Sequence, residues 1–202
     1  MLITVNKKIT FSEISEITSA QDVLKKVYGD LDSIELPIDI DLIINSIEGV
    51  SLSEELDLSN LNTAGFIHVK RDNENNVKDV RIWTNPTEAD TRMRFTKAHE
   101  VGHLVFDIFP SLNDTNVNEE FIERLNRKEG SNSYIEQRAN RFAAQLLMPA
   151  QLVKKEVSKL VSLYKKQNKK ISLEQAIEEL ASKFDTSKDA MKFRLKNLNI
   201  IS

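Results

Sequence analysis

Residues 99–103 read His-Glu-Val-Gly-His, and no other short segment of the 202-residue chain is better suited to chemistry. Residues four apart on a helix lie on the same face, about 40° apart around the axis. Both imidazoles, those of His99 and His103, can therefore reach one Zn²⁺ ion. Glu100 projects beside the pair, where it can deprotonate a water held by that ion. The spacing predicts a metal site that activates water for hydrolysis.

A catalytic zinc ion needs a third protein ligand and keeps one position for water. The remaining histidine, His68, has no ligand spacing to the pair and is interpreted as an ordinary strand residue. A carboxylate is the better-supported third ligand, and Glu136 is the best candidate. It starts a helix rich in alanine, and small side chains allow that helix to pack closely against the one that carries His99 and His103.

Four further side chains are candidates for supporting roles. Asn140 lies one helical turn after Glu136, where it could accept a hydrogen bond from the free ring N–H of a ligand histidine. Asp107, one turn beyond His103, is a competing candidate for the same role. Tyr134 and Arg138 are candidates to stabilise the oxyanion that forms when a carbonyl is attacked. The alternative for each of them is packing, helix–helix hydrogen bonding or solvation.

Two segments resemble the ImmA/IrrE family of metallo-endopeptidases. Residues 94–103 read Arg-Phe-Thr-Lys-Ala-His-Glu-Val-Gly-His and are similar to the RFTLAHELGH helix of that family. Residues 136–149 are similar to its ExxANxFAAxLLMP helix, in the same order along the chain. Lys97 and Val101 depart from the pattern, because leucines are common at these two positions. The resemblance covers about residues 60–200.

The resemblance implies the roles of the site residues and the reaction. It implies that His99, His103 and Glu136 bind Zn²⁺ and that Glu100 is the catalytic base. The ligand types also allow Mn²⁺ or Fe²⁺. Members of the family typically cleave a helix-turn-helix transcriptional repressor and so derepress its genes. We therefore expect a zinc endopeptidase whose protein substrate is such a repressor.

The elements that position these residues are predicted to be mostly helical. Residues 64–70 and 80–84 are typical of two strands, and the polar cluster 72–76 is typical of a turn, which makes a hairpin. One helix is predicted from about residue 87 to 107 and another from about 134 to 148. We expect an α+β fold, with a mostly helical, zincin-like domain and a small antiparallel hairpin or sheet beside the HExxH helix.

We expect the chain to divide into three regions. Residues 1–58 form an N-terminal helical segment of unassigned role, residues 59–150 the metallopeptidase core, and residues 151–202 a helical region packed on that core. In the last region, helices that begin at Ser172 and Ser187 resemble a helix-turn-helix pair.

The charge of the C-terminal region leaves a second function open. Residues 151–202 contain 12 Lys and Arg against 6 Asp and Glu, whereas residues 1–150 contain 16 against 25. Basic charge on the second helix of the pair allows contact with DNA. Glu174, Glu178 and Glu179 on the first helix would repel phosphates, so packing or substrate binding is favoured. The alternative function is a DNA- or protein-binding regulator with a non-catalytic metal site.

Composition narrows the class of protein further. The chain is 40% hydrophobic and 29% charged, which is ordinary for a globular protein. It has no cysteine, which excludes disulfides, thiolate catalysis and cysteine-rich zinc fingers. No apolar run approaches 18 residues, and residues 1–8 lack the features of a signal peptide. We therefore expect a cytoplasmic protein without a membrane partner.

Overall fold

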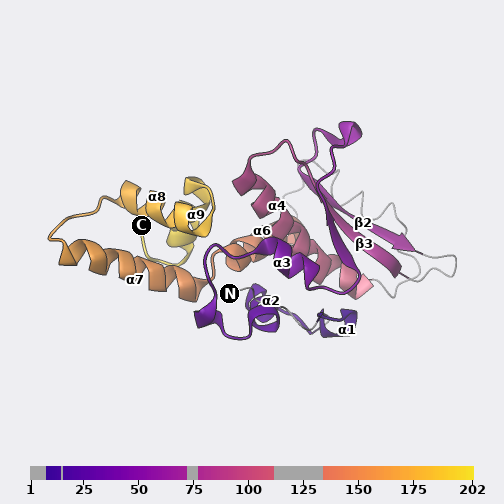
Figure 1. Ribbon diagram of the computed structural model, residues 1–202, viewed down its shortest axis with the longest axis horizontal. Helices are drawn as coiled ribbons and strands as arrows, with labels where there is room; N and C mark the ends of the chain where they lie inside the picture. The colour runs from indigo at the N-terminus through magenta and orange to yellow at the C-terminus, as the bar shows by residue number, and fades with distance from the viewer. Residues whose placement is uncertain (1–7, 15, 72–76, 112–133) are drawn as a thin grey trace.

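The structure is a computed structural model that describes residues 8–14, 16–71, 77–111 and 134–202. Its strands are β1 (Val50–Ser53), β2 (Gly65–Arg71) and β3 (Val77–Thr84). Its α-helices are α1 (Phe11–Ile14), α2 (Ala20–Tyr28), α3 (Ile40–Asn45), α4 (Asp90–His103), α6 (Tyr134–Leu147), α7 (Ala150–Lys166), α8 (Leu173–Phe184) and α9 (Lys188–Asn197). Figure 1 shows the sheet on one side of α4 and α6, and α7, α8 and α9 extending away on the other. The expected α+β, mostly helical fold is confirmed.

The sheet has three strands in the order β1-β3-β2. The predicted hairpin is present, since β2 and β3 pair antiparallel with Phe66 opposite Trp83. Its turn cluster at residues 72–76 lies outside the described residues. β1 is an addition that the sequence did not predict, and it pairs parallel to β3 with Val50 opposite Val80. Only one of its four residues is buried, and its alternation of apolar and polar residues is short, so β1 gives a weak strand signal in the sequence.

The helices α4 and α6 pack together at the centre of the molecule. A Cβ atom added to Gly102 would lie 3.2 Å from Ala139 Cα and 3.2 Å from Phe142 Cδ1. Ala139 and Ala143 are buried in this contact, as the alanine-rich sequence of α6 predicts. The close approach of the two backbones brings side chains of α4 and α6 within reach of one another.

The N-terminal segment packs against these helices, with α2 against α6 and α3 against α4. α2 begins at Ser19, whose hydroxyl accepts a hydrogen bond from the Asp22 amide, and ends at Gly29, where φ is 75°. The latter conformation is readily available only to glycine. Val23 and Leu24 of α2 are buried in the core.

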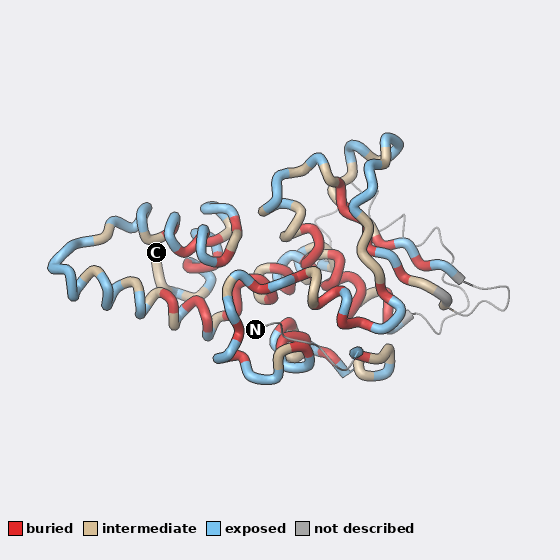
Figure 2. Tube along the Cα trace, in the orientation of Figure 1, coloured by how far each residue is buried: buried red, intermediate tan, exposed pale blue. Residues whose placement is uncertain are grey.

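The three C-terminal helices follow α6 after a short connection at Pro149. Ser172 and Gln175 form the predicted capping box of α8, and the Ser187 hydroxyl accepts from the Ala190 amide at the start of α9. Figure 2 shows buried residues concentrated in α4, in α6 and at the near end of α7, whereas the far end of α7 is exposed. In the part of the chain that the structure describes, no helix combines the length and apolarity needed to cross a bilayer.

Candidate metal centre

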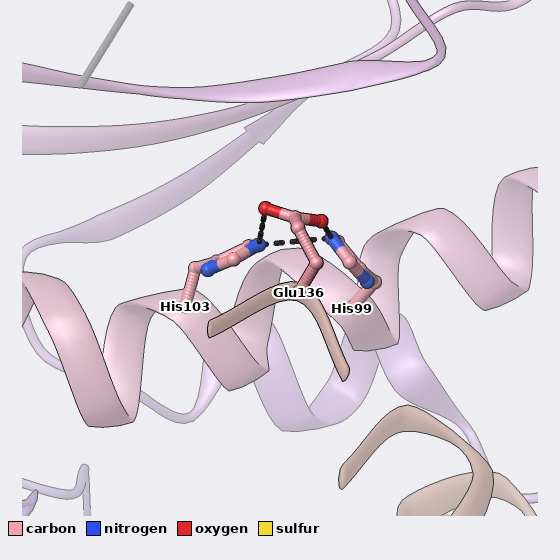
Figure 3. Close-up of side chains that lie close together, drawn as sticks. All are labelled: His99, His103 and Glu136. Atoms are coloured by element: carbon pink, nitrogen blue, oxygen red, sulfur yellow. Dashed lines mark hydrogen bonds and ion pairs between the residues drawn. The ribbon is translucent and has the colours of Figure 1, made fainter. Parts of the chain in front are cut away.

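Three predicted ligands converge on one point between α4 and α6 (Figure 3). His99 Nε2 lies 3.2 Å from Glu136 Oε2, and His103 Nε2 lies 3.3 Å from Glu136 Oε1. The two Nε2 atoms are 2.9 Å apart. The carboxylate from α6 therefore faces both imidazoles of α4, as the sequence predicted.

These separations suit a tetrahedral metal ion. Bonds of roughly 2.0–2.1 Å from zinc to nitrogen or oxygen place the ligand atoms about 3.3 Å apart at tetrahedral corners. The observed separations of 2.9, 3.2 and 3.3 Å lie close to this value. Three protein ligands leave one position for water or substrate. Two imidazoles and one carboxylate suit Zn²⁺ and also accommodate Mn²⁺ or Fe²⁺.

Each histidine is oriented by a hydrogen bond at its other ring nitrogen. His99 Nδ1 lies 3.0 Å from Asn140 Oδ1, and His103 Nδ1 lies 2.9 Å from Asp107 Oδ2. Because both partners are acceptors, each Nδ1 carries the proton, and each Nε2 presents its lone pair to the ligand cluster. Asn140 and Asp107, which the sequence offered as competing candidates for one role, thus each serve one histidine.

The two oxyanion candidates lie differently from one another. The Arg138 guanidinium donates to the Asp107 carboxylate and stacks 4.9 Å above the centre of the Phe106 ring. Its guanidinium therefore helps to hold Asp107 in place. The Tyr134 side chain is among the exposed large hydrophobic residues, at 76% exposure. An oxyanion role for either residue stays a prediction.

A turn of π-helix, η3 (Leu104–Ile108), follows α4 directly and carries Asp107. Turns of this kind are rare and often lie at functional sites. Asp107 lies four residues after His103 and contacts it, while Val105 and Ile108 are buried in the core. His68 does not join the cluster, because it lies on β2 with its side chain exposed.

Glu100 is buried beside the cluster, at 4% exposure. Burial raises its pKa to about 7, with an opposing effect from His103 and a supporting one from Glu136. A carboxyl with such a pKa can take up and return a proton near neutral pH. Glu100 therefore has the environment of a general base.

A close approach that the sequence did not predict lies at the start of β2. A Cβ atom on Gly65 would lie 2.5 Å from Thr96 Cγ2 and 3.4 Å from Glu100 Oε1. Only glycine allows the strand to pass this close to α4. The one signal in the sequence is a glycine at the start of a predicted strand, which often marks a close backbone approach.

The protonation of the two histidines differs because of their neighbours. Burial and the charge of His103 lower the pKa of His99. Burial also opposes the charged form of His103, but the hydrogen bond to Asp107 and the charges of Glu100 and Glu136 outweigh it and raise its pKa. As the pH falls, His103 is therefore protonated before His99. A metal ion competes with that proton, so its affinity falls as the pH falls.

Comparison with known proteins identifies a family. The model of a peptidase family, described as the IrrE N-terminal-like domain, matches residues 67–196, which is more than half of the chain. A search of curated proteins gave no match. The matched range includes α4 and α6, so it contains all three candidate ligands and Glu100.

Proposed function

The chain belongs to the peptidase family of the IrrE N-terminal-like domain, and from this premise we propose that it is a zinc-dependent endopeptidase. The observation that carries the proposal is the convergence of His99, His103 and Glu136, with buried Glu100 beside them. A purely structural zinc site normally has four protein ligands and needs no adjacent base. Three ligands and a carboxyl of raised pKa match the requirements of hydrolysis.

The proposed mechanism gives each residue one task. When bound, Zn²⁺ supplies a Lewis acid that makes water more acidic and polarises the carbonyl of the scissile peptide bond. Glu100 accepts a proton from the attacking water as its oxygen bonds to the carbonyl carbon. Glu100 then delivers that proton to the amide nitrogen as the C–N bond breaks. Asn140 and Asp107 keep both imidazoles in the tautomer that can bind the metal.

An extended segment of the substrate is proposed to lie along β2. This strand pairs only with β3 among the described strands, so its other edge is available for hydrogen bonding. Its first residue, Gly65, lies next to Glu100. A peptide bound at this edge would therefore pass the base and the metal ligands.

The proposed substrate is a helix-turn-helix transcriptional repressor, whose cleavage in the cytoplasm would derepress its genes. The support is the resemblance of the two motif helices to the ImmA/IrrE family and the match to its domain. A small repressor of this type encoded next to the gene would be the substrate to test first.

The test is the Glu100→Gln variant, assayed for zinc content and for cleavage of that repressor. We expect the variant to retain zinc, because Glu100 is not a ligand, and to lose roughly 10²–10⁴-fold in cleavage rate. Elemental analysis and a timed cleavage assay measure the two properties. Wild-type activity in the variant would exclude Glu100 as the base.

The alternative, a DNA-binding regulator with a non-catalytic metal site, has weaker support. Lys188 of α9 bonds to Glu178 at 2.6 Å, and Arg194 is buried with its Nε donating to the Met148 carbonyl. Two of the cations of α9 therefore face protein groups, while Lys192 and Lys196 are exposed. A gel shift with duplex DNA that weakens with salt would favour the alternative.

A further inference from the structure

A groove lies between the catalytic helices and the C-terminal pair. It has a volume of about 760 Å³ and is lined by one face of α6 and one face of α9, with Phe95 of α4 at its side. The lining residues used below are Phe95, Asn140, Arg141, Met148, Phe193 and Arg194. The groove is distinct from the edge of β2, where the peptide bond to be cleaved is proposed to lie.

The walls of the groove are fixed by bonds between distant parts of the chain. Arg194 Nε donates to the Met148 carbonyl oxygen at 2.8 Å, which ties α9 to the end of α6. Arg94 Nε lies 3.0 Å from Asp185 Oδ2, which ties α4 to the turn between α8 and α9. The groove is thus a built feature of the fold.

The groove carries positive charge without a matching acid. Arg194 is 7% exposed, and no carboxylate of the described residues lies within ion-pair distance of it. Arg141 lines the same groove with an exposed side chain and likewise lacks an acidic partner among those residues. No Asp or Glu lines the groove. A buried guanidinium is costly to leave without an anion, so the groove is suited to a carboxylate ligand.

Apolar side chains line the groove beside the two arginines. Phe193 is 64% exposed although it is a large aromatic residue, and it lines the groove with Phe95 and Met148. Exposed aromatic and arginine side chains around a concave surface are typical of binding sites for proteins. Along α6 and the residue that follows it, the lining runs from Gln137 to Met148, which spans roughly 16 Å at 1.5 Å per residue. That length fits a peptide segment.

We propose that this groove binds an acidic segment of the protein substrate, with carboxylates against Arg141 and Arg194 and an apolar side chain between Phe95 and Phe193. The identity of the occupant as substrate rests on the proposed function. Asn140 lies in the groove and also holds His99 at 3.0 Å, so the bound segment would touch the residue that orients a metal ligand. The groove thus selects the substrate beside the point of cleavage.

Isothermal titration calorimetry of the full chain tests the proposal with two synthetic peptides. One is N-acetylated, C-amidated Leu-Glu-Phe-Glu-Glu-Leu, and the other is its uncharged twin, in which Gln replaces Glu. The titrations use zinc-loaded Glu100→Gln protein and, separately, metal-free wild-type protein. We expect the acidic peptide to bind at least about tenfold more tightly than its twin in both preparations.

Three variants locate the binding. Arg141→Gln and Phe193→Ala change exposed side chains, so folding is expected to persist, and each should weaken binding of the acidic peptide by roughly five- to tenfold. Lys192→Gln removes the same charge from an exposed position of α9 outside the groove and should change binding less than about twofold. Circular dichroism confirms that each variant is folded.

The outcomes separate this proposal from the proposed function. The proposal that the groove binds an acidic segment is overturned if the two peptides bind with equal affinity or if neither binds. Equal losses of affinity in Arg141→Gln and Lys192→Gln would also overturn it. Binding confined to the zinc-loaded protein would place the peptide on the metal and also overturn it. None of these measurements requires cleavage. If the groove binds as expected and the repressor is not cleaved, only the proposed function fails.

Discussion

At the scale of single residues, the metal centre depends on what each ring nitrogen contacts. Asn140 and Asp107 each accept from one Nδ1, which leaves both Nε2 atoms for the ion. Arg138 in turn donates to Asp107. The pair of ligands on α4 is therefore held by side chains from two elements, and the third ligand comes from α6.

Glu136→Ala should lower zinc affinity more than any other change on α6. It removes one of three protein ligands and leaves two imidazoles, so we expect a loss of at least about 100-fold. Competition with a chromogenic chelator measures the affinity. Gln137→Ala, at the exposed neighbouring position, is the matched control and should bind zinc like the wild type. Unchanged affinity in Glu136→Ala would move the third ligand elsewhere.

At the scale of elements, α4 and α6 position the site because their backbones approach closely at Gly102. A Cβ at this position already lies at 3.2 Å from Ala139 Cα, which belongs to the backbone and cannot rotate away. Alanine at position 102 gains about 1 kcal/mol of helix propensity, which offsets part of that crowding. A branched side chain gains less and adds two more methyl groups to the same contact.

Gly102→Val should therefore destabilise the protein by roughly 2–3 kcal/mol and weaken zinc binding as α4 and α6 move apart. Urea unfolding at constant pH measures the free energy, and chelator competition measures the affinity. Lys154→Val places the same branched residue at an exposed position of α7 and should cost less than about 1 kcal/mol. A loss in Gly102→Val no larger than the loss in Lys154→Val would contradict the crowding of α4 against α6 at this position.

The sequence predicted the elements that carry local signals. The helices with His99 and Glu136 were found from apolar spacing and motif, and the caps at Ser172 and Ser187 from their side chains. β1 was missed because its partner, β3, lies thirty residues further along the chain. The contact of Gly65 with Glu100 was missed for the same reason, since neighbours in space leave no periodicity in sequence.

At the scale of the whole molecule, one buried lysine joins the N-terminal segment to the metal-binding helix. Lys97 Nζ lies 2.7 Å from Asp41 Oδ1 and 2.6 Å from Glu54 Oε1, and the lysine side chain is only 7% exposed. Burial opposes the charge of Lys97, but the two carboxylates outweigh it and raise its pKa. Asp41 and Glu54 are nearly half exposed, so water can solvate them without the lysine.

Because Lys97 is buried and the two carboxylates are half exposed, removing the lysine and removing the carboxylates should change the free energy of unfolding by different amounts. Lys97→Met leaves two solvated acids and a buried apolar chain, and should change the free energy of unfolding by less than about 1 kcal/mol. Asp41→Asn combined with Glu54→Gln leaves a buried charge without an anion, and should cost roughly 3 kcal/mol. Urea unfolding at neutral pH compares them, and a larger loss in Lys97→Met would contradict the argument.

The contact between α7 and α8 depends on a second buried charge. Glu156 is 7% exposed in its side chain and bonds to Lys159 on its own helix and to Lys183 on α8, both at 2.6 Å. Burial opposes its ionised form, but the two lysines outweigh burial and lower the pKa of Glu156 from its ordinary value of 4.5. A lowered pKa in the folded state means that ionised Glu156 stabilises the fold.

The sign of the pH dependence follows from that shift. The stabilisation by Glu156 is fully present above its ordinary pKa of 4.5 and is lost as the pH falls through the lower folded-state value. Glu156→Gln should therefore cost about 1 kcal/mol at pH 7, because glutamine keeps the shape and loses the charge, and less at pH 3. Urea unfolding of both proteins at the two pH values measures the difference. Glu174→Gln, at an exposed position of α8, should show no such change, and a constant cost of Glu156→Gln across the range would mean that packing, and not charge, joins the two helices.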